Sequence, residues 1–361
     1  MKYYSLKKIL KHNAQYNIII GERSNGKTYA VLYHGLKKAW ERGEQLAIVR
    51  RWRDDFVGKN GQQMFSALSE TGAIAEITGG EFTNIFYKAS RWYLGNFDEK
   101  GKPVLEPEPI CYAFALTAME HDKSTSYPKV TTVLFDEFMT RAGYLPDEFI
   151  LFMNVLSTII RQRDNVQIFM CANTVNKYCP YFKEMGLSHV RDMKQGTIEV
   201  YTYGESNLRV AVEYCRPAGQ SKQSDTYFAF DNPKLNMIKS GVWELDVYPH
   251  CPYKYKPKDV LFKYYIQFDG QTLCAEIVSV DGNAFTFIHP HTREFSEKQL
   301  EQEIIYGTDF HPQPNRKRKL TIAQTRQEKR ILWYYQYDKV FYSDNETGEL
   351  VRNYLMWCGK N

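Results

Sequence analysis

The sequence predicts an α/β protein with a central, mostly parallel sheet flanked by helices, followed by a small α+β domain. Three patterns support this prediction. Short apolar runs alternate with helical stretches through the first half, and a glycine-rich segment joins one such run to a helix. After residue 259, strand patterns are separated by Asp-Gly corners. We therefore expect domains over residues 1–215 and 259–361, joined over 216–258 by a linker with short helices.

The composition suits a folded chain of this kind. Its 361 residues are 43% hydrophobic and 15% aromatic, which argues against disorder, and a net charge of +5 permits nucleic-acid binding without requiring it. The seven cysteines are scattered without a C-x-x-C pair, so we expect reduced thiols in a cytoplasm, and we interpret His250-Cys251 and His289-Pro290-His291 as ordinary loop residues. No apolar stretch approaches about 18 residues, and no apolar signal segment is recognised, so no membrane span is expected.

The glycine-rich segment lies between a predicted strand over 16–20 and a predicted helix over 28–40. It fits G-x-x-x-x-G-K-[ST], the Walker A or phosphate-binding loop. The motif consists of Gly21, Glu22, Arg23, Ser24, Asn25, Gly26, Lys27 and Thr28.

The residue types of this loop indicate phosphate chemistry. Gly21 and Gly26 allow close approach of the main chain, so that successive N–H groups can form an anion nest at the start of a helix. We expect Lys27 to reach the β- and γ-phosphates of a nucleotide and the Thr28 hydroxyl to ligate Mg²⁺. The alternative is a glycine turn followed by a chance Lys-Thr.

The next stretch adds strands and one helix. Gly43 is expected to end the first helix, and strands are predicted over 45–49, within 81–97 and over 110–115, with a helix over 54–70 and a turn over 98–103. The arginine cluster 50–53 at the end of a strand could sense nucleotide or contact a neighbour; a solvated strand end is an equal alternative.

An apolar run over 131–135 ends in Asp136 and Glu137, which has the form of a Walker B motif. A carboxylate at a strand end can hold Mg²⁺ through its water shell, a role we assign to Asp136. Glu137 can then polarise the attacking water as general base. The alternative is a strand simply capped by acids.

A helix over 147–160 and a strand over 166–171 follow, and the strand leads to Asn173. In P-loop ATPases of the additional-strand class, the strand after Walker B ends in a polar residue that faces the γ-phosphate, and Asn173 is placed for that role. Asparagine at a strand end also favours turns. Strands over 197–203 and 209–214 complete the first domain, and the segment 217–222 has linker composition.

The last part of the chain predicts strands over 260–268, 272–280 and 284–288, then helices over 296–305 and 320–338. Asp269 and Asp281 fall at hairpin corners, where turn chemistry explains them. The basic run 315–319, followed by Arg326, Lys329 and Arg330, indicates a nucleic-acid contact, with a localisation signal or a solvated face as alternatives.

Together these motifs resemble a known family, the small DNA-packaging ATPases of phi29-like podoviruses. The resemblance rests on GERSNGKTYA, EQLAIVRRW, DKSTSYPKVTTVLFDEF, TIIRQRDNVQIFMCAN and the Pro-Tyr-Phe at 180–182, and it covers about residues 16–185. It implies an additional-strand P-loop ATPase that uses ATP and Mg²⁺ to drive double-stranded DNA into a procapsid. It also implies a homomeric ring, typically a pentamer, at the portal vertex in the host cytoplasm and outside the mature virion, with a structural RNA as a further partner left open. The C-terminal domain would be a reduced RNase H-like domain without nuclease activity.

The resemblance also implies roles for basic residues. Arg161 matches a trans-acting arginine finger with Arg163 beside it, Lys123 matches a second residue acting across the ring interface, and Arg141 matches another basic position. Solvated charges are the alternative for Lys123 and Arg141. The rival functions are a nucleotide-gated nucleic-acid-binding assembly protein with little turnover, another P-loop translocase or helicase, and a terminase that cleaves DNA.

Overall fold

The computed structural model describes residues 4–121, 125–141, 143–175, 178–216, 243 and 248–360. The chain divides into two compact units, a first unit of Met1–Arg141 and Asp147–Glu244 and a second unit of Ala142–Pro146 and Leu245–Asn361. Most of the expected linker lies outside the described residues, whereas 248–258 belong to the second unit. No helix among the described residues is long and apolar enough to cross a membrane.

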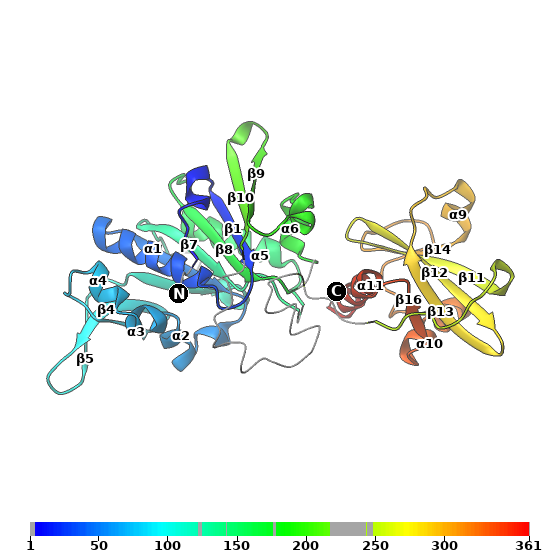
Figure 1. The fold of residues 1–361 in the computed structure, drawn as a ribbon, viewed down its shortest axis with the longest axis horizontal. Coiled ribbons are helices and arrows are strands. Elements are labelled where there is room, and N and C mark those ends of the chain that lie inside the picture. Colours follow the sequence, from blue (N-terminus) through cyan, green and yellow to red (C-terminus); the bar gives the residue numbers. More distant parts are fainter. Residues whose placement is uncertain are drawn as a thin grey trace. The chain divides into compact units, whose positions relative to one another are not determined.

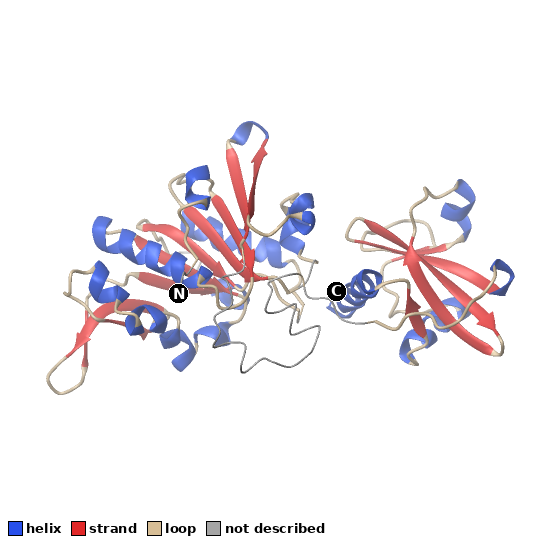
Figure 2. Cartoon of the chain, viewed as in Figure 1, coloured by secondary structure: helices blue, strands red, loops and turns tan. Residues whose placement is uncertain are grey.

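The first unit is built on one large sheet, seen as the red arrows of that unit in Figure 2. Its order is β3-β4-β6-β2-β7-β8-β1-β10-β9, with β5 beside β4. The neighbours from β6 to β10 in this order are parallel, and β3, β4, β5 and β9 add antiparallel edges, as predicted for an α/β fold. In the described chain its strands are β1 (Tyr16–Gly21), β2 (Gln45–Arg50), β3 (Asn84–Lys88), β4 (Arg91–Phe97), β5 (Pro103–Leu105), β6 (Cys111–Ala115), β7 (Val130–Asp136), β8 (Gln167–Asn173), β9 (Thr197–Tyr203) and β10 (Leu208–Tyr214).

The central strands are apolar on both faces because helices cover both sides of a parallel sheet. β7 is buried at every residue, and β8 lies between β1 and β7. The register sets Gly21 of β1 opposite Asn173 of β8, and Asp136 of β7 opposite Cys171. The strand order therefore brings the predicted phosphate loop, the Walker B acids and Asn173 to one edge of the sheet.

The helices of the first unit include the expected long ones (Figure 1). α1 starts after Gly26, which has a left-handed φ of 88°, and it ends before Gly43, whose left-handed φ of 64° is typical of the residue that terminates a helix. The helical segments are α1 (Lys27–Arg42), α2 (Lys59–Gln63), α3 (Ser66–Glu70), α4 (Ala73–Ile77), α5 (Glu148–Ile160) and α6 (Pro180–Glu184), with 3₁₀ turns at Ile9–His12, Arg53–Phe56, Leu116–His121, Ser188–Asp192 and Gly204–Ser206.

The single helix predicted over 54–70 is wrong, because the chain there forms a 3₁₀ turn followed by α2 and α3. Gly58 has a positive φ of 57° and starts a new segment. Gly61 packs so tightly on Tyr87 of β3 that a Cβ there would lie 2.3 Å from the ring, and its carbonyl accepts a hydrogen bond from Trp92 Nε1 at 2.8 Å. Packing on the β3–β4 hairpin outweighs the helical pattern.

The core of the first unit occupies both faces of the sheet. On one face α1 packs against β1 and β2 through buried aliphatic side chains such as Val31, Leu36 and Ile48. A separate aromatic cluster joins Phe135 of β7 to Phe152 of α5, with ring centroids 4.7 Å apart. Each fully buried side chain of this kind contributes about 1.5–3 kcal/mol, so the sheet is held rigidly beneath its polar edge.

The second unit contains a mixed sheet with the order β15-β14-β11-β12-β13-β16. Its corners at Asp269-Gly270 and Asp281-Gly282 have positive φ at both residues, which confirms the predicted hairpins. Among the described residues its elements are β11 (Val260–Phe268), β12 (Gln271–Val280), β13 (Asn283–Pro290), β14 (Ile304–Tyr306), β15 (Arg316–Lys317), β16 (Val340–Tyr342), α9 (Glu297–Gln302), α10 (Arg326–Gln336) and α11 (Asn345–Lys360), with a 3₁₀ turn at Pro257–Asp259.

Both helices predicted in this part are too long. The first ends at Gln302, since Ile304–Tyr306 pairs in parallel with β11 as β14. The second begins only at Arg326, where Thr325 and Glu328 form a capping box that fixes the helix start. Part of the basic run 315–319 forms an edge strand, β15. The interpretation of His289 as a loop residue is wrong, because it lies in β13.

Candidate nucleotide-binding site

The predicted phosphate loop connects β1 to α1 with the close backbone contacts that its glycines allow. A Cβ on Gly21 would lie 2.9 Å from the Cβ of Cys215, and Gly26 has a left-handed φ of 88°. The loop is also held from the N-terminal arm, because Tyr4 N donates to Asn25 O at 3.0 Å and Tyr4 Oη donates to Glu213 at 2.6 Å. This bracing by Tyr4 was not predicted, since no local pattern links it to the loop.

Lys27 lies inside the loop and is 5% exposed. Its Nζ donates to the carbonyl of Glu22 at 2.6 Å and to the Oδ1 atoms of Asn25 and Asn173, each at 3.3 Å. Burial lowers the pKa of Lys27, while nearby acidic groups partly oppose this shift. The structure therefore brings Asn173, from β8, to the same point as the loop lysine.

Thr28 and Asp136 form a pair of oxygen ligands across α1 and β7. Thr28 Oγ1 donates to Asp136 Oδ1 at 2.6 Å, although the two residues are 108 positions apart. Hydroxyl and carboxylate oxygens side by side match the preference of Mg²⁺ for hard oxygen ligands. The residues present therefore fit a magnesium ion at this position.

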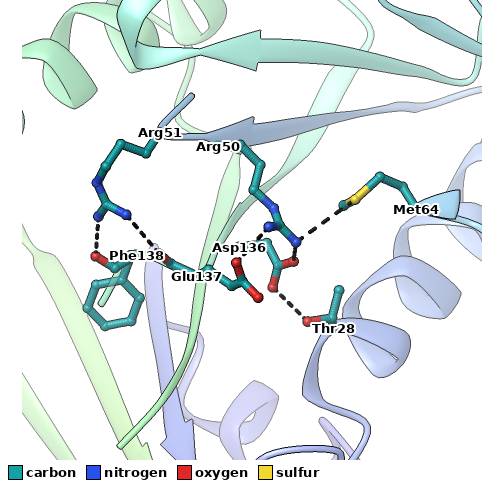
Figure 3. Close-up of polar contacts among 7 residues, drawn as sticks. All are labelled: Thr28, Arg50, Arg51, Met64, Asp136, Glu137 and Phe138. Carbon is teal, nitrogen blue, oxygen red and sulfur yellow. Dashed lines mark hydrogen bonds and ion pairs between the residues drawn. The ribbon is translucent and has the colours of Figure 1, made fainter. Parts of the chain in front are cut away.

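Arg50, at the end of β2, contacts both Walker B acids (Figure 3). Its guanidinium donates to Asp136 Oδ2 at 2.5 Å and to Glu137 Oε2 at 2.7 Å. Burial alone would lower the pKa of Arg50, but the two carboxylates outweigh it and the pKa is raised. Arg50 thus holds the side chains of both acids in one charged cluster.

The next residue, Arg51, lies just after β2 and contacts the backbone that follows β7, at the carbonyls of Glu137 and Phe138 (Figure 3). It is buried and makes a two-pronged ion pair with Glu148, with Nε–Oε2 and Nη2–Oε1 distances of 2.7 Å. It also donates to the carbonyl of Phe138 at 2.8 Å, and Tyr181 Oη donates to Glu148 at 2.9 Å. Arg51 therefore ties the backbone after β7 to the start of α5.

From the sequence, the arginines within 50–53 were predicted to form one cluster. In the structure Arg50 and Arg51 have different ion-pair partners. The only signal for the Arg51 contact was Glu148, an acid at the first position of an otherwise apolar helix. Glu137 has a positive φ of 57°, so the turn that Arg51 fastens is a backbone conformation uncommon outside glycine. This conformation carries Glu137 out of the strand toward Arg50.

The predicted arginine finger lies elsewhere in the chain. Arg161 directly follows α5, and its Nη2 donates to the carbonyl of Thr125 at 2.9 Å. Arg163 is bound to main-chain carbonyls before and at the start of β7, including Val130 O at 2.7 Å, so its contacts are structural. Arg141 is half-buried, and Lys123 lies outside the described residues.

These contacts set Arg161 at the opposite edge of the sheet from the phosphate loop. Thr125 and Val130 precede or begin β7, whereas Asp136 ends it. A strand of this length spans about 20 Å. Arg161 is therefore not part of the site that Lys27, Thr28, Asp136 and Asn173 form in its own chain.

The strand order, the phosphate loop and the acids at the end of β7 define a P-loop fold of the additional-strand class. Within this class the chain belongs to a particular family. Its residues 1–202, more than half of the chain, match the family described as Podovirus DNA encapsidation protein (Gp16).

Individual relatives agree with this assignment. The DNA packaging protein of Bacillus phage B103 is 30% identical over 183 residues, and that of Bacillus phage phi29 is 26% identical over 185 residues. The chain spans about half the length of these curated relatives, 50% and 49% respectively. The solved Phi-28 gp11 DNA packaging motor shares the fold over 99% of this chain and 98% of its own, with a TM-score of 0.55 and 17% identity.

Proposed function

We propose that this chain is an ATP-hydrolysing motor subunit that drives double-stranded viral DNA into a procapsid. The observation that carries the proposal is the convergence of Lys27, Thr28, Asp136 and Asn173 at one sheet edge. Membership of a family of DNA encapsidation proteins supports the cargo. The motor would act in the host cell at the portal vertex of the procapsid.

Each residue of the site has a chemical task in this proposal. The loop N–H groups and Lys27 bind the β- and γ-phosphates of ATP, and Asn173 lies beside Lys27 where it can contact the γ-phosphate. Magnesium held by Thr28 and Asp136 supplies neutralisation of the phosphate charge. Glu137, at the mouth of the site with a side chain 62% exposed, orients and deprotonates the attacking water.

Arg50 sets a condition on this chemistry. While its guanidinium binds Glu137 Oε2 at 2.7 Å, that carboxylate oxygen is occupied and does not contact an attacking water. Glu137 must exchange Arg50 for water before it acts as base. We infer that Arg50 keeps basal hydrolysis low and that events which draw it away accelerate turnover.

The same proposal includes a homomeric ring in which Arg161 completes the site of a neighbouring copy. Its position at the far end of β7, a strand about 20 Å long, from Asp136 supports action in trans. Arg161 also lines a surface groove of about 580 Å³ with Met153, Leu156, Ser157, Ile160 and Gln162, which is suited to a protein contact. A permanently charged guanidinium in this place would stabilise the charge that develops on the γ-phosphate.

We further propose that the second unit contacts nucleic acid or the portal. In the basic run 315–319, Lys317 pairs with Glu328 at 3.1 Å and Arg318 stacks on Phe310 at 3.9 Å, so part of its charge is used within the unit. The exposed face of α10 is a better candidate, since Arg326, Arg330, Trp333 and Tyr337 follow one another at helical spacing. The corner positions of Asp269 and Asp281 support the absence of nuclease activity.

The experiment that tests the proposal is ATP turnover with and without double-stranded DNA. We expect DNA to stimulate the wild type, Glu137→Gln to lower turnover about 10²–10⁴-fold and Arg161→Ala about 10³-fold or more. Matched controls are Glu41→Gln and Arg42→Ala, which change exposed groups on α1. Mixing Arg161→Ala with Glu137→Gln subunits should restore part of the activity if Arg161 acts in trans.

The outcomes separate the rival functions. Nucleotide binding and ring assembly with turnover that is negligible and indifferent to both substitutions would favour a nucleotide-gated assembly protein. Unwinding of duplex DNA by the isolated chain would favour a helicase. Nicking of plasmid DNA in Mg²⁺ or Mn²⁺ would favour a cleaving terminase.

A further inference from the structure

A second group of potential ligands lies on one face of the sheet in the second unit. Cys274 of β12 and His289 of β13 are directly opposite each other in the antiparallel register. Glu276 follows Cys274 by two residues, so its side chain projects from the same face. The three side chains therefore meet through strand pairing and do not depend on a loop.

The geometry of this group is close to that of a metal site. One ligand atom from each of Cys274, Glu276 and His289 lies within 4.8 Å of the other two. The ligands of a tetrahedral zinc ion are about 3.3–3.8 Å apart, so side-chain shifts of about 1 Å would complete the site. The Cys274 residue is 3% exposed and the Glu276 side chain 12%, which limits competition from water.

Surrounding contacts orient these groups as metal ligands are usually oriented. Tyr255 Oη donates to Glu276 Oε2 at 2.6 Å. His289 Nδ1 lies 3.0 Å from the carbonyl of Pro290, which can only accept, and the imidazole tautomer that donates this hydrogen bond from Nδ1 has a lone pair on Nε2 for a metal ion. His291, two residues on, adds a buried Nε2 without a hydrogen-bond partner among the described residues.

We propose that Cys274, Glu276 and His289 form a binding site for Zn²⁺ or a similar borderline-soft divalent cation. A thiolate, a carboxylate and a neutral imidazole supply the sulfur, oxygen and nitrogen ligands that zinc accepts, with a total charge that balances a dication. Binding releases the thiol proton to solvent and changes no oxidation state. The ion would fasten β12 to β13 and is independent of the nucleotide site.

Lys263 decides whether the group is a metal site or an ordinary ion pair. Its Nζ lies 2.7 Å from Glu276 Oε1, and its side chain is 44% exposed. The ammonium is thus a cation already beside the carboxylate, on a long side chain that can turn toward solvent. A metal site predicts that removing this charge tightens metal binding, because the competing cation is lost.

The test is titration of the reduced full-length chain with Co²⁺ and then Zn²⁺ in excess Mg²⁺. We expect one Co²⁺ with a thiolate-to-cobalt absorption band, which Zn²⁺ abolishes by displacement. Cys274→Ser and His289→Ala should lose the band, Tyr255→Phe should weaken binding about tenfold, and Lys263→Met should strengthen it. Cys251→Ser and His311→Ala are the matched controls outside the group and should behave as the wild type.

Thermal unfolding in the presence of a chelator shows whether each variant still folds. If Cys274→Ser does not fold, the test relies on His289→Ala, which alters only a half-buried side chain. Absence of a thiolate band in the wild type would overturn the proposal. A band that persists in Cys274→Ser, or that disappears in Cys251→Ser, would also overturn it by placing the ion elsewhere. Weaker Co²⁺ binding in Lys263→Met would mean that Glu276 is an ion-pair partner of Lys263 and not a metal ligand.

Discussion

The two sheets of this protein place their charged groups differently. In the first unit, Lys27, Arg50 and Asp136 come from α1, β2 and β7 and meet at one edge of the sheet. In the second unit, opposite charges form separate pairs. Lys263 and Glu276 are opposite each other on neighbouring strands, and Lys317 pairs with Glu328 in the first turn of α10. The first sheet thus brings several charged groups together at one site, whereas the second sheet neutralises its charges in separate ion pairs.

The difference follows from strand direction. Parallel strands all end at the same edge, so their last residues converge although long segments separate them in the chain. Antiparallel neighbours pair residue by residue, so that opposite charges meet across the strands. A parallel sheet can therefore assemble a reactive cluster, while the mixed sheet of the second unit is suited to structural contacts. Three substitutions test this comparison, two at the edge of the first sheet and one in the second unit, and the largest expected effect comes first.

Arg51→Ala should have the largest effect, because Arg51 belongs to the edge of the first sheet but has a structural role. It would leave Glu148 buried without its ion-pair partner, which costs about 3–5 kcal/mol of the free energy of unfolding. Chemical denaturation of the full-length chain measures this change in the transition of the first unit. Arg53→Ala, which truncates an exposed neighbour, is the control and should cost less than about 0.5 kcal/mol. Equal losses in the two variants would contradict the structural role assigned to Arg51 and its ion pair with Glu148.

Arg50→Gln should change binding more than stability. Its guanidinium competes with Mg²⁺ for Asp136, so removing it should lower the Mg²⁺ concentration needed for half-maximal nucleotide binding by roughly threefold to tenfold. Titration of a fluorescent ATP analogue with Mg²⁺ measures this shift, with Arg53→Gln as the control. An unchanged or increased Mg²⁺ requirement would mean that Arg50 supports the metal site and does not compete with it.

Glu328 provides the test in the second unit. Burial raises the pKa of Glu328, but the N–H groups of Gln324 and Thr325 and the ammonium of Lys317 outweigh it, so the pKa is lowered. Its stabilising contribution is therefore complete above the usual glutamate range and is lost as pH falls through the folded-state pKa. Glu328→Gln should remove about 1–2 kcal/mol at neutral pH and flatten the loss of stability below about pH 4.5. Denaturant unfolding across this pH range measures the free energy of unfolding, with Glu297→Gln at an exposed residue as the control. If the pH dependence of stability in Glu328→Gln equals that of the wild type, the stabilising role of the Glu328 carboxylate is contradicted.

Much of the first unit could be predicted because its signals are local. The segment 21–28, the apolar run before Asp136 and the left-handed caps of α1 depend on residues close together in the chain. The helix predicted over 54–70 failed because Gly61 packs against a hairpin about 25 residues away. The helices predicted over 296–305 and 320–338 were overextended for a similar reason, since β14 pairs with β11 and a capping box starts α10.

The phosphate loop, the acids at and just after the end of β7, and the Asp-Gly corners of the second sheet could all be predicted from the sequence alone. Each depends on backbone conformations and residue types within a few positions, and these are encoded locally. The contacts of Arg50 with the acids and of Arg51 with Glu148 emerge only in the folded chain, as does the meeting of Cys274, Glu276 and His289 on one face. Arg50 and Asp136 are 86 positions apart in the chain, and Arg51 and Glu148 are 97 positions apart. These partners depend on which strands and helices the fold brings together, and this is not encoded in any short segment.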